Sequence, residues 1–306
     1  MNRVFYHRMD LDGHASGAIA RRWLEQRGEA FRLYPYDYAD PFPETDVAAG
    51  ESVWFLDVAW QPFENMARLK RERRCRVVLI DHHRSLMDSG VLAALEAHVS
   101  ADNSRSACLL AWGVFFPQEP VPEWTELLSR YDVWDDADRE MWRSRIHPFQ
   151  MGMQAQATDP MESWPFWQRL FARNERSTRS FVNETIRNGQ AILAWSTARN
   201  AHDAKDHAFE ARLGGRTALC INSTNFSSST LDAAWDPLRH DLMLIYARRR
   251  NGTYRVGLFT RRPEVDVSAI AGELGGGGHR AAAGLTARSV LVRDHELLIE
   301  PLSTGA

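Results

Sequence analysis

The sequence has few cysteines and no long apolar segment. Its three cysteines, Cys75, Cys108 and Cys220, are far apart and form no CxxC pair, so we expect reduced thiols in a cytosolic protein. No apolar run approaches the roughly 20 residues that cross a bilayer. The charged N-terminal stretch MNRVFYHRMDLDG is unlike a secretory signal. We therefore expect a soluble cytoplasmic protein with no membrane partner.

The sequence also has no excess of positive charge. Its formal net charge is −3 and its pI is about 6.4. Without an overall positive field the chain is poorly suited to long duplex DNA, so any contact with nucleic acid must be local. The 306 residues, 44% of them hydrophobic and 25% charged, are enough for two domains with separate cores.

Short apolar strands alternate with amphipathic helices in the first half. We expect strands at 3–6, 31–36, 52–56 and 76–80, a helix at 15–26, and a second helix that begins at Pro62. Such alternation is typical of an α/β fold, in which helices cover both faces of a parallel sheet.

The second half changes character. The pattern is helical from 121 to about 204, and strands return near Phe209. We therefore predict a first domain at 1–190, a helical linker at 191–204 and a smaller α/β domain at 205–306, with the active site in the cleft between the two domains.

Acidic and imidazole side chains follow three of the expected strands. Because ligands bind at the carboxyl ends of parallel strands, these side chains should converge at one edge of the sheet. They are His7, Asp10 and Asp12 after the first strand, Asp57 after the third, and Asp81, His82 and His83 after the fourth.

This convergence indicates a metal site. A single strand-end Asp is usually a helix cap or turn residue, but three such strand ends together favour a cation that neutralises the carboxylates. Carboxylate and imidazole without thiolate suit Mn²⁺ better than Mg²⁺. The acids are numerous enough for two ions that share a carboxylate, as in two-metal phosphoryl chemistry.

A glycine-rich stretch, EVDVSAIAGELGGGGHRAAAG (264–284), lies near the C-terminus. Consecutive glycines let backbone N–H groups converge on an anion, and His279, Arg280, Arg261 and Arg262 would add donors. The alternative is a flexible linker, which a close-packing alanine run would rarely follow.

Together these motifs resemble the DHH phosphoesterase superfamily, with its DHH domain and DHH-associated C-terminal domain. YHRMDLDGHASGA (6–18), FLDVAW, LIDHH, YDVWDD (131–136) and GGGGHRAAAG occur in the family's order and span residues 6 to 284. The YDVWD motif and the short chain most resemble those of the small nano-RNase (oligoribonuclease) branch.

The resemblance implies roles for individual residues. Asp57 would bridge the two ions, Asp81 would orient an imidazole, and His83 would face the substrate as an acid or phosphate donor. The implied metal ligands are His7, Asp10, Asp12, Asp57, His82 and Asp132. The implied substrate contacts are Arg105, Ser106, Arg261, Gly276, Gly277, Gly278 and His279. The register of the first motif departs from the family pattern, so His14 competes with His7 and Asp10 as a ligand.

The expected function follows from this resemblance. We expect a phosphodiesterase with two Mn²⁺ ions, for which Mg²⁺ or Co²⁺ can substitute, that hydrolyses single-stranded oligonucleotides of about 2–5 nucleotides to mononucleotides. The alternatives are a cyclic-dinucleotide phosphodiesterase, a 3′,5′-bisphosphonucleotide (pAp) phosphatase and, from another class, a catalytically silent nucleotide sensor. The Trp- and Arg-rich helical region is compatible with a homodimer surface.

Overall fold

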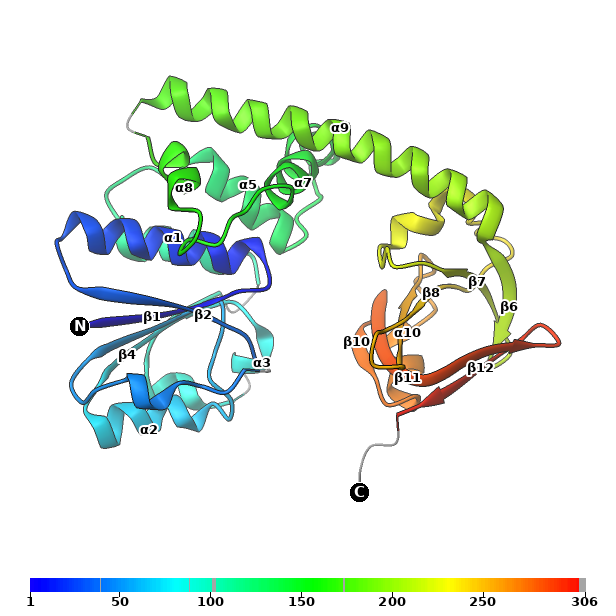
Figure 1. Cartoon of the computed structure of the whole chain (residues 1–306), viewed down its shortest axis with the longest axis horizontal. Helices are drawn as coiled ribbons and strands as arrows, with labels where there is room; N and C mark the ends of the chain where they lie inside the picture. The colour runs from blue at the N-terminus through cyan, green and yellow to red at the C-terminus, as the bar shows by residue number, and fades with distance from the viewer. Residues whose placement is uncertain (39, 88, 101–102, 173, 303–306) are drawn as a thin grey trace. The chain divides into compact units, whose positions relative to one another are not determined.

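The computed structural model describes residues 1–38, 40–87, 89–100, 103–172 and 174–302 (Figure 1). The chain divides into two compact units, Met1–Leu193 and Ala194–Ala306. The division falls inside the long helix α9 (Glu175–His207), so the expected linker at 191–204 is helical. Among the described residues, no helix has the length and apolar character that a membrane crossing requires.

The first unit is built on a parallel sheet. Its strands are β1 (Asn2–His7), β2 (Phe31–Tyr36), β3 (Ser52–Leu56), β4 (Arg76–Asp81) and β5 (Glu96–Val99). They lie in the order β2-β1-β3-β4-β5, and every neighbouring pair is parallel. The order places the carboxyl ends of β1, β3 and β4 side by side, which confirms the expected parallel arrangement.

Alternate side chains of these strands are buried on opposite faces of the sheet. Tyr6 and Leu56 belong to a core with helices α1 (Leu11–Gln26) and α4 (Ala107–Phe115). Phe5 and Phe55 belong to a second core with helix α2 (Glu64–Arg73). Because successive residues of a strand point to opposite faces, a run that is apolar throughout requires cover on both sides. Figure 1 shows α1 and α2 on the two sides of the sheet.

The remaining helices of the first unit lie around these layers. They are α3 (Arg84–Met87), α5 (Glu123–Asp132), α6 (Arg139–Met141), α7 (His147–Gln154) and α8 (Trp164–Leu170), with 3-10 turns at Glu44–Asp46 and Val91–Ala94 and a π turn at Trp142–Ile146. The expected start of the second helix at Pro62 is wrong, since α2 begins at Glu64.

The second unit is dominated by β-structure. Its elements are β6 (Phe209–Leu213), β7 (Arg216–Asn222), a 3-10 turn (Ser228–Ala234), β8 (Leu242–Arg248), β9 (Tyr254–Phe259), α10 (Val267–Glu273), β10 (Gly277–His279), β11 (Ala282–Arg293) and β12 (Glu296–Pro301). The long strand β11 pairs with both β9 and β12, so the sheet closes on itself. The expected small α/β domain is therefore largely a barrel-like sheet, with α10 packed into its core.

Candidate metal centre

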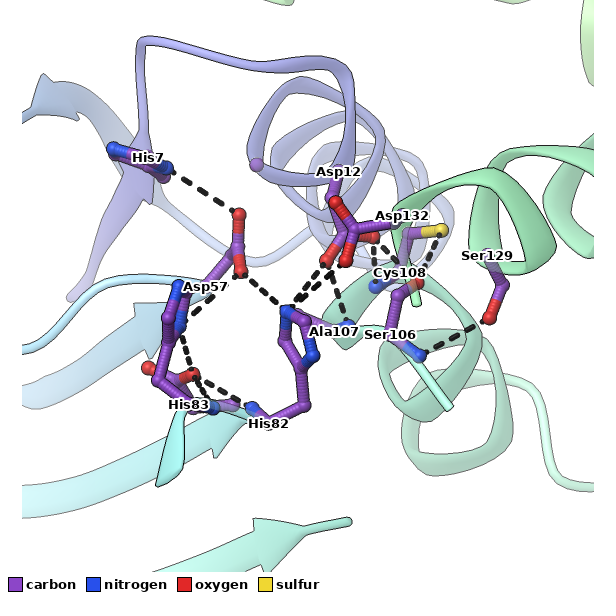
Figure 2. Close-up of polar contacts among 12 residues, drawn as sticks. His7, Asp12, Asp57, His82, His83, Ser106, Ala107, Cys108, Ser129 and Asp132 are labelled. Carbon is purple, nitrogen blue, oxygen red and sulfur yellow. Dashed lines mark hydrogen bonds and ion pairs between the residues drawn. The ribbon is translucent and has the colours of Figure 1, made fainter. Parts of the chain in front are cut away.

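The strand ends of the first unit bring the predicted acids and imidazoles together. His7 and Asp81 are the last residues of β1 and β4, and Asp57 follows β3 directly. Asp10 and Asp12 come from the loop and first turn of α1, and Asp132 is the last residue of α5. Figure 2 shows His7, Asp12 and Asp132 grouped around Asp57 and His82.

Asp57 lies between two sets of candidate ligands. One carboxylate oxygen, Oδ2, is 3.5 Å from Nδ1 of His7, and the other, Oδ1, is 3.4 Å from Nε2 of His82 (Figure 2). The residue is 1% exposed, and neither oxygen has a hydrogen-bond partner among the described residues. Its backbone has φ of +60°, an uncommon conformation for a residue other than glycine. Asp57 therefore presents one oxygen to each side.

Three overlapping groups of donor atoms surround this carboxylate. Within each group the donor atoms lie within 4.8 Å of one another. The groups are His7, Asp10 and Asp57; Asp57, His82 and His83; and Asp12, His82 and Asp132. Ligands about 2.1 Å from a small divalent ion lie roughly 3–4 Å apart, so each group is close enough to hold one ion.

The donor set fits a divalent cation. A buried carboxylate normally accepts hydrogen bonds or faces a positive charge, because an unpaired buried charge is costly. Asp57 has neither an Arg nor a Lys partner among the described residues. Oxygen and imidazole ligands are the types that Mn²⁺ and related ions accept. The residues present thus match a metal centre with Asp57 in the middle.

The two histidines of the DHH sequence are held by different partners. The Nδ1 of His82 is 2.6 Å from Oδ1 of Asn103, which leaves Nε2 facing Asp12, Asp57 and Asp132. The Nδ1 of His83 is 2.7 Å from Oδ1 of Asp81, and the same oxygen accepts from both backbone N–H groups of the histidines. Asp81 therefore orients the ring of His83, whose side chain is 40% exposed.

Asp12 is a candidate metal ligand and also accepts hydrogen bonds from the start of α4. Its Oδ2 accepts from the N–H of Ala107 at 2.8 Å, and its Oδ1 accepts from the N–H of Cys108 at 2.9 Å. These are N–H groups of the first turn of α4, where a carboxylate is stabilised by the helix dipole. The Oδ2 atom of Asp12 also lies 3.7 Å from Nε2 of His82.

Ser106, one of the expected substrate contacts, contacts Asp12 in the structure. This residue is fully buried, and its hydroxyl donates to Oδ1 of Asp12 at 2.7 Å. Its N–H donates to Oγ of Ser129 on α5 (Figure 2). A buried hydroxyl with these partners positions Asp12. The neighbouring Arg105 is exposed.

The first motif places His7 and Asp10 in the site but turns His14 away. The Nδ1 of His7 is 2.6 Å from Oδ2 of Asp10. Both ring nitrogens of His14 are occupied, by Oγ1 of Thr158 at 2.9 Å and by the carbonyl of Arg8 at 3.1 Å. His14 belongs to none of the donor groups found among the described residues.

The electrostatics of the cluster reflect its burial and its many acids. Burial, together with the charge of Asp12 and other carboxylates, raises the pKa of Asp57 well above its ordinary value. The same causes raise the pKa of Asp132 to about 9. The carboxylate of Asp81 raises the pKa of His83, while burial opposes it. In His7, burial lowers the pKa but Asp10 and Asp37 outweigh it. The cluster thus favours bound positive charge.

The predicted substrate contacts of the second unit lie on and around β10. Gly277, Gly278 and His279 form this exposed strand, and Gly276 precedes it. Gly278 has φ of +145°, and a Cβ there would lie 2.6 Å from Cα of Ala283, so the pairing of β10 with β11 requires glycine. Arg261 forms an ion pair with Asp232.

A cavity of about 490 Å³ opens beside the glycine stretch. It is lined by Arg249, Arg255, Gly275, Gly276 and other residues of the second unit. Arg255 lies on β9 and Arg249 directly follows β8. Nothing in the sequence distinguishes them from other arginines, because their common cavity depends on closure of the sheet.

Two residues of the metal centre were also missed. Asn103 orients His82 from 21 residues away. Asp37 follows β2 and lies 3.6 Å from Nε2 of His7. Asp37 directly follows the predicted strand 31–36, so the rule that ligands bind at the carboxyl ends of parallel strands also applies to it.

Comparison with known proteins gives few relatives in sequence. No family model matches the chain. The uncharacterised protein R106 of Acanthamoeba polyphaga mimivirus is 22% identical over 230 residues, which are 68% of this chain. The chain spans about half, 47%, of the length of that relative.

Solved structures give a clearer likeness in fold. The pGpG-specific phosphodiesterase PggH from Vibrio cholerae is similar with a TM-score of 0.51 and 12% identity, over 94% of this chain and 93% of that one. The exonuclease RecJ bound to manganese has a TM-score of 0.45 and 15% identity, over 92% and 84% of the two chains. The likeness to PggH extends over nearly the whole chain and shows a shared fold.

Proposed function

We propose that this protein is a phosphodiesterase dependent on two Mn²⁺ ions, and that it hydrolyses oligonucleotides of about 2–5 nucleotides to mononucleotides. The observation that carries the proposal is Asp57, a buried carboxylate with no hydrogen-bond partner in the described part of the chain. One of its oxygens is directed to His7 and the other to His82. This is the arrangement that a carboxylate shared by two ions requires. Mg²⁺ or Co²⁺ would be substitutes.

The proposed ligands divide between the two oxygens of Asp57. His7 and Asp10 would hold one ion, and Asp12, His82 and Asp132 would hold the other. When bound, two such ions supply a hydroxide near neutral pH and stabilise the attacking and leaving oxygens of a phosphodiester. Asn103 and Ser106 would keep His82 and Asp12 in orientation, as outer hydrogen-bond partners do in metal sites.

His83 is proposed to act on the substrate. Asp81 accepts from its Nδ1, so Nε2 of the partly exposed ring is left to donate a hydrogen bond to a phosphate oxygen or a proton to the leaving group. Arg105 is proposed as a further phosphate contact.

The second unit is proposed to bind the substrate away from the reacting phosphate. Gly276, Gly277, Gly278 and His279 would supply N–H and imidazole donors, and Arg261 would add a guanidinium donor. The cavity beside Arg249 and Arg255 adds positive charge, which suits a phosphate. The substrate of PggH, as its name states, is pGpG, a dinucleotide. This supports a short substrate for a chain of the same fold.

A substrate panel with Mn²⁺ tests the proposal. We expect fastest cleavage of di- to pentanucleotides, slower cleavage of decanucleotides, loss of activity with EDTA and better recovery with Mn²⁺ than with Mg²⁺. Preferred turnover of cyclic dinucleotides or of pAp would replace the proposed substrate and retain the metal mechanism. Binding of pApA with Mn²⁺ but without cleavage would instead identify a sensor.

A further inference from the structure

Trp134 is an exposed aromatic residue beside the candidate metal centre. It is 65% exposed, whereas Trp112, Trp124 and Trp167 are buried in the core of the same unit. Trp134 follows the candidate ligand Asp132 by two residues. Two residues of chain span at most about 7 Å, so the backbone of Trp134 lies next to the metal centre.

The backbone at Trp134 would favour glycine. Helix α5 ends with the N–H of Trp134 donating to the carbonyl of Tyr131 at 3.1 Å, and the N–H of Asp135 donating to that of Arg130 at 2.8 Å. This pair of bonds is the Schellman motif, which places one residue in the left-handed conformation. Trp134 is that residue, with φ of +58°. A bulky side chain is uncommon there, so the helix end itself does not account for tryptophan.

Neighbouring rings support Trp134 from one side. Its ring centroid is 5.0 Å from that of Trp142 and 5.9 Å from that of Tyr131. Tyr131 and Trp142 are themselves stacked, at 5.5 Å and 9°. The cluster restricts the indole of Trp134 and leaves much of its surface open to solvent. A restrained, exposed indole can bind a flat aromatic group at little entropic cost.

We propose that Trp134 stacks on a nucleobase of the substrate whose phosphodiester lies at the metal centre. This inference rests on the proposed function and adds a requirement to it: the substrate carries an aromatic base next to the reacting phosphate. Because each base has a π-face, stacking on Trp134 favours nucleotides over phosphodiesters without bases and discriminates little between bases.

The test compares a dinucleotide, pApA, with an abasic dinucleotide of the same sugar and phosphate chain. We expect Trp134→Gly to lower the ratio of kcat/KM for pApA to that for the abasic compound by roughly 5- to 150-fold. Trp134→Phe should keep most of the ratio, since it retains a ring. Trp195→Ala is the matched control, because Trp195 is 67% exposed but lies on α9, and it should leave the ratio unchanged.

The outcomes separate this inference from the proposed function. An unchanged ratio in Trp134→Gly, with a melting temperature showing a folded protein, would overturn the stacking role. If the wild-type protein binds pApA without cleaving it, the proposed function fails, and the ratio of dissociation constants for the two compounds then tests Trp134 by the same criterion. Wild-type protein that binds neither compound would overturn both.

Discussion

Replacing Asp57 with Asn should stabilise the metal-free protein and remove most of the stabilisation that metal provides. Without metal, the buried carboxylate has no hydrogen-bond partner among residues 1–38, 40–87, 89–100, 103–172 and 174–302, and it lies near other acids. An amide of the same shape can donate to neighbouring carboxylates, and Asn tolerates the positive φ as well as Asp does. Relieving an unsatisfied buried polar group is worth about 1–3 kcal/mol. At about 2–4 °C per kcal/mol for a unit of this size, Asp57→Asn should melt about 2–12 °C above wild type in EDTA.

With Mn²⁺ the wild type should gain stability, whereas the variant should gain little. An ion present at 100 times its Kd stabilises the wild-type fold by about 2.7 kcal/mol, or roughly 5–11 °C. Asp57→Asn lacks the charged ligand that both ions would share, so its gain should be small. Its turnover should fall by more than about 100-fold, since loss of even an outer partner of a metal ligand costs 10- to 100-fold.

Thermal melts by circular dichroism in EDTA and in Mn²⁺, with rates on pApA, measure both effects. Glu51→Gln is the control, because Glu51 is also largely buried but accepts from Arg3 at 2.8 Å and 3.1 Å. It should lower the melting temperature and leave the response to Mn²⁺ intact. A less stable Asp57→Asn in EDTA, together with a wild-type gain in Mn²⁺, would refute the reasoning.

Three further predictions concern neighbouring contacts. Asn103→Gly keeps the positive φ but frees Nδ1 of His82, so Mn²⁺ affinity measured by calorimetry should fall about 10- to 100-fold, and an unchanged Kd would contradict the role of Asn103. Ser106→Ala removes a donor to the buried Asp12 and should cost about 1–3 kcal/mol in urea unfolding, whereas wild-type stability would argue against it. The Arg3 guanidinium lowers the pKa of Glu51, so the stability advantage of wild type over Glu51→Gln should be full above about pH 4.5 and shrink as the pH falls through the lowered folded pKa. An advantage that does not change down to pH 2 would contradict this.

The sheet and its polar edge were predictable because both depend on local patterns. The predicted bounds of β2 and β3 agree with the structure, since each apolar run ends at a polar residue. The start of α1 was placed too late, at 15. The stretch LDGHASGA contains two glycines and looks like a poor helix, yet Asp10 caps it by accepting from the N–H of Gly13. A Cβ on Gly13 would lie 2.1 Å from the carbonyl oxygen of His7, so glycine there reflects close packing against β1.

The contacts that orient the site could not be read from the sequence. Ser106 reaches Asp12 across 94 residues, and a serine before an apolar helix has many other possible partners. The polar residues around Ser106 in the sequence predict a phosphate contact. Its burial depends on how α4 packs on α1, which the sequence does not show. The closure of the second sheet is equally non-local, because β11 must pair on both sides.

Comparison with the two acids of the first motif, Asp10 and Asp12, shows why a substitution at Asp57 best distinguishes an effect on catalysis from an effect on folding. Asp10 caps α1, and Asp12 satisfies the first N–H groups of α4. Removing either one leaves helix N–H groups without partners, which costs stability whether or not a metal binds. Asp57 accepts no hydrogen bond from any residue that the structure describes, so the described fold gains nothing from its carboxylate. Asp57 is buried and has a positive φ, and its carboxylate does not stabilise the fold, so a bound ligand is the reason for an acid at this position. A loss of activity in a folded Asp57 variant therefore reports on the metal centre alone.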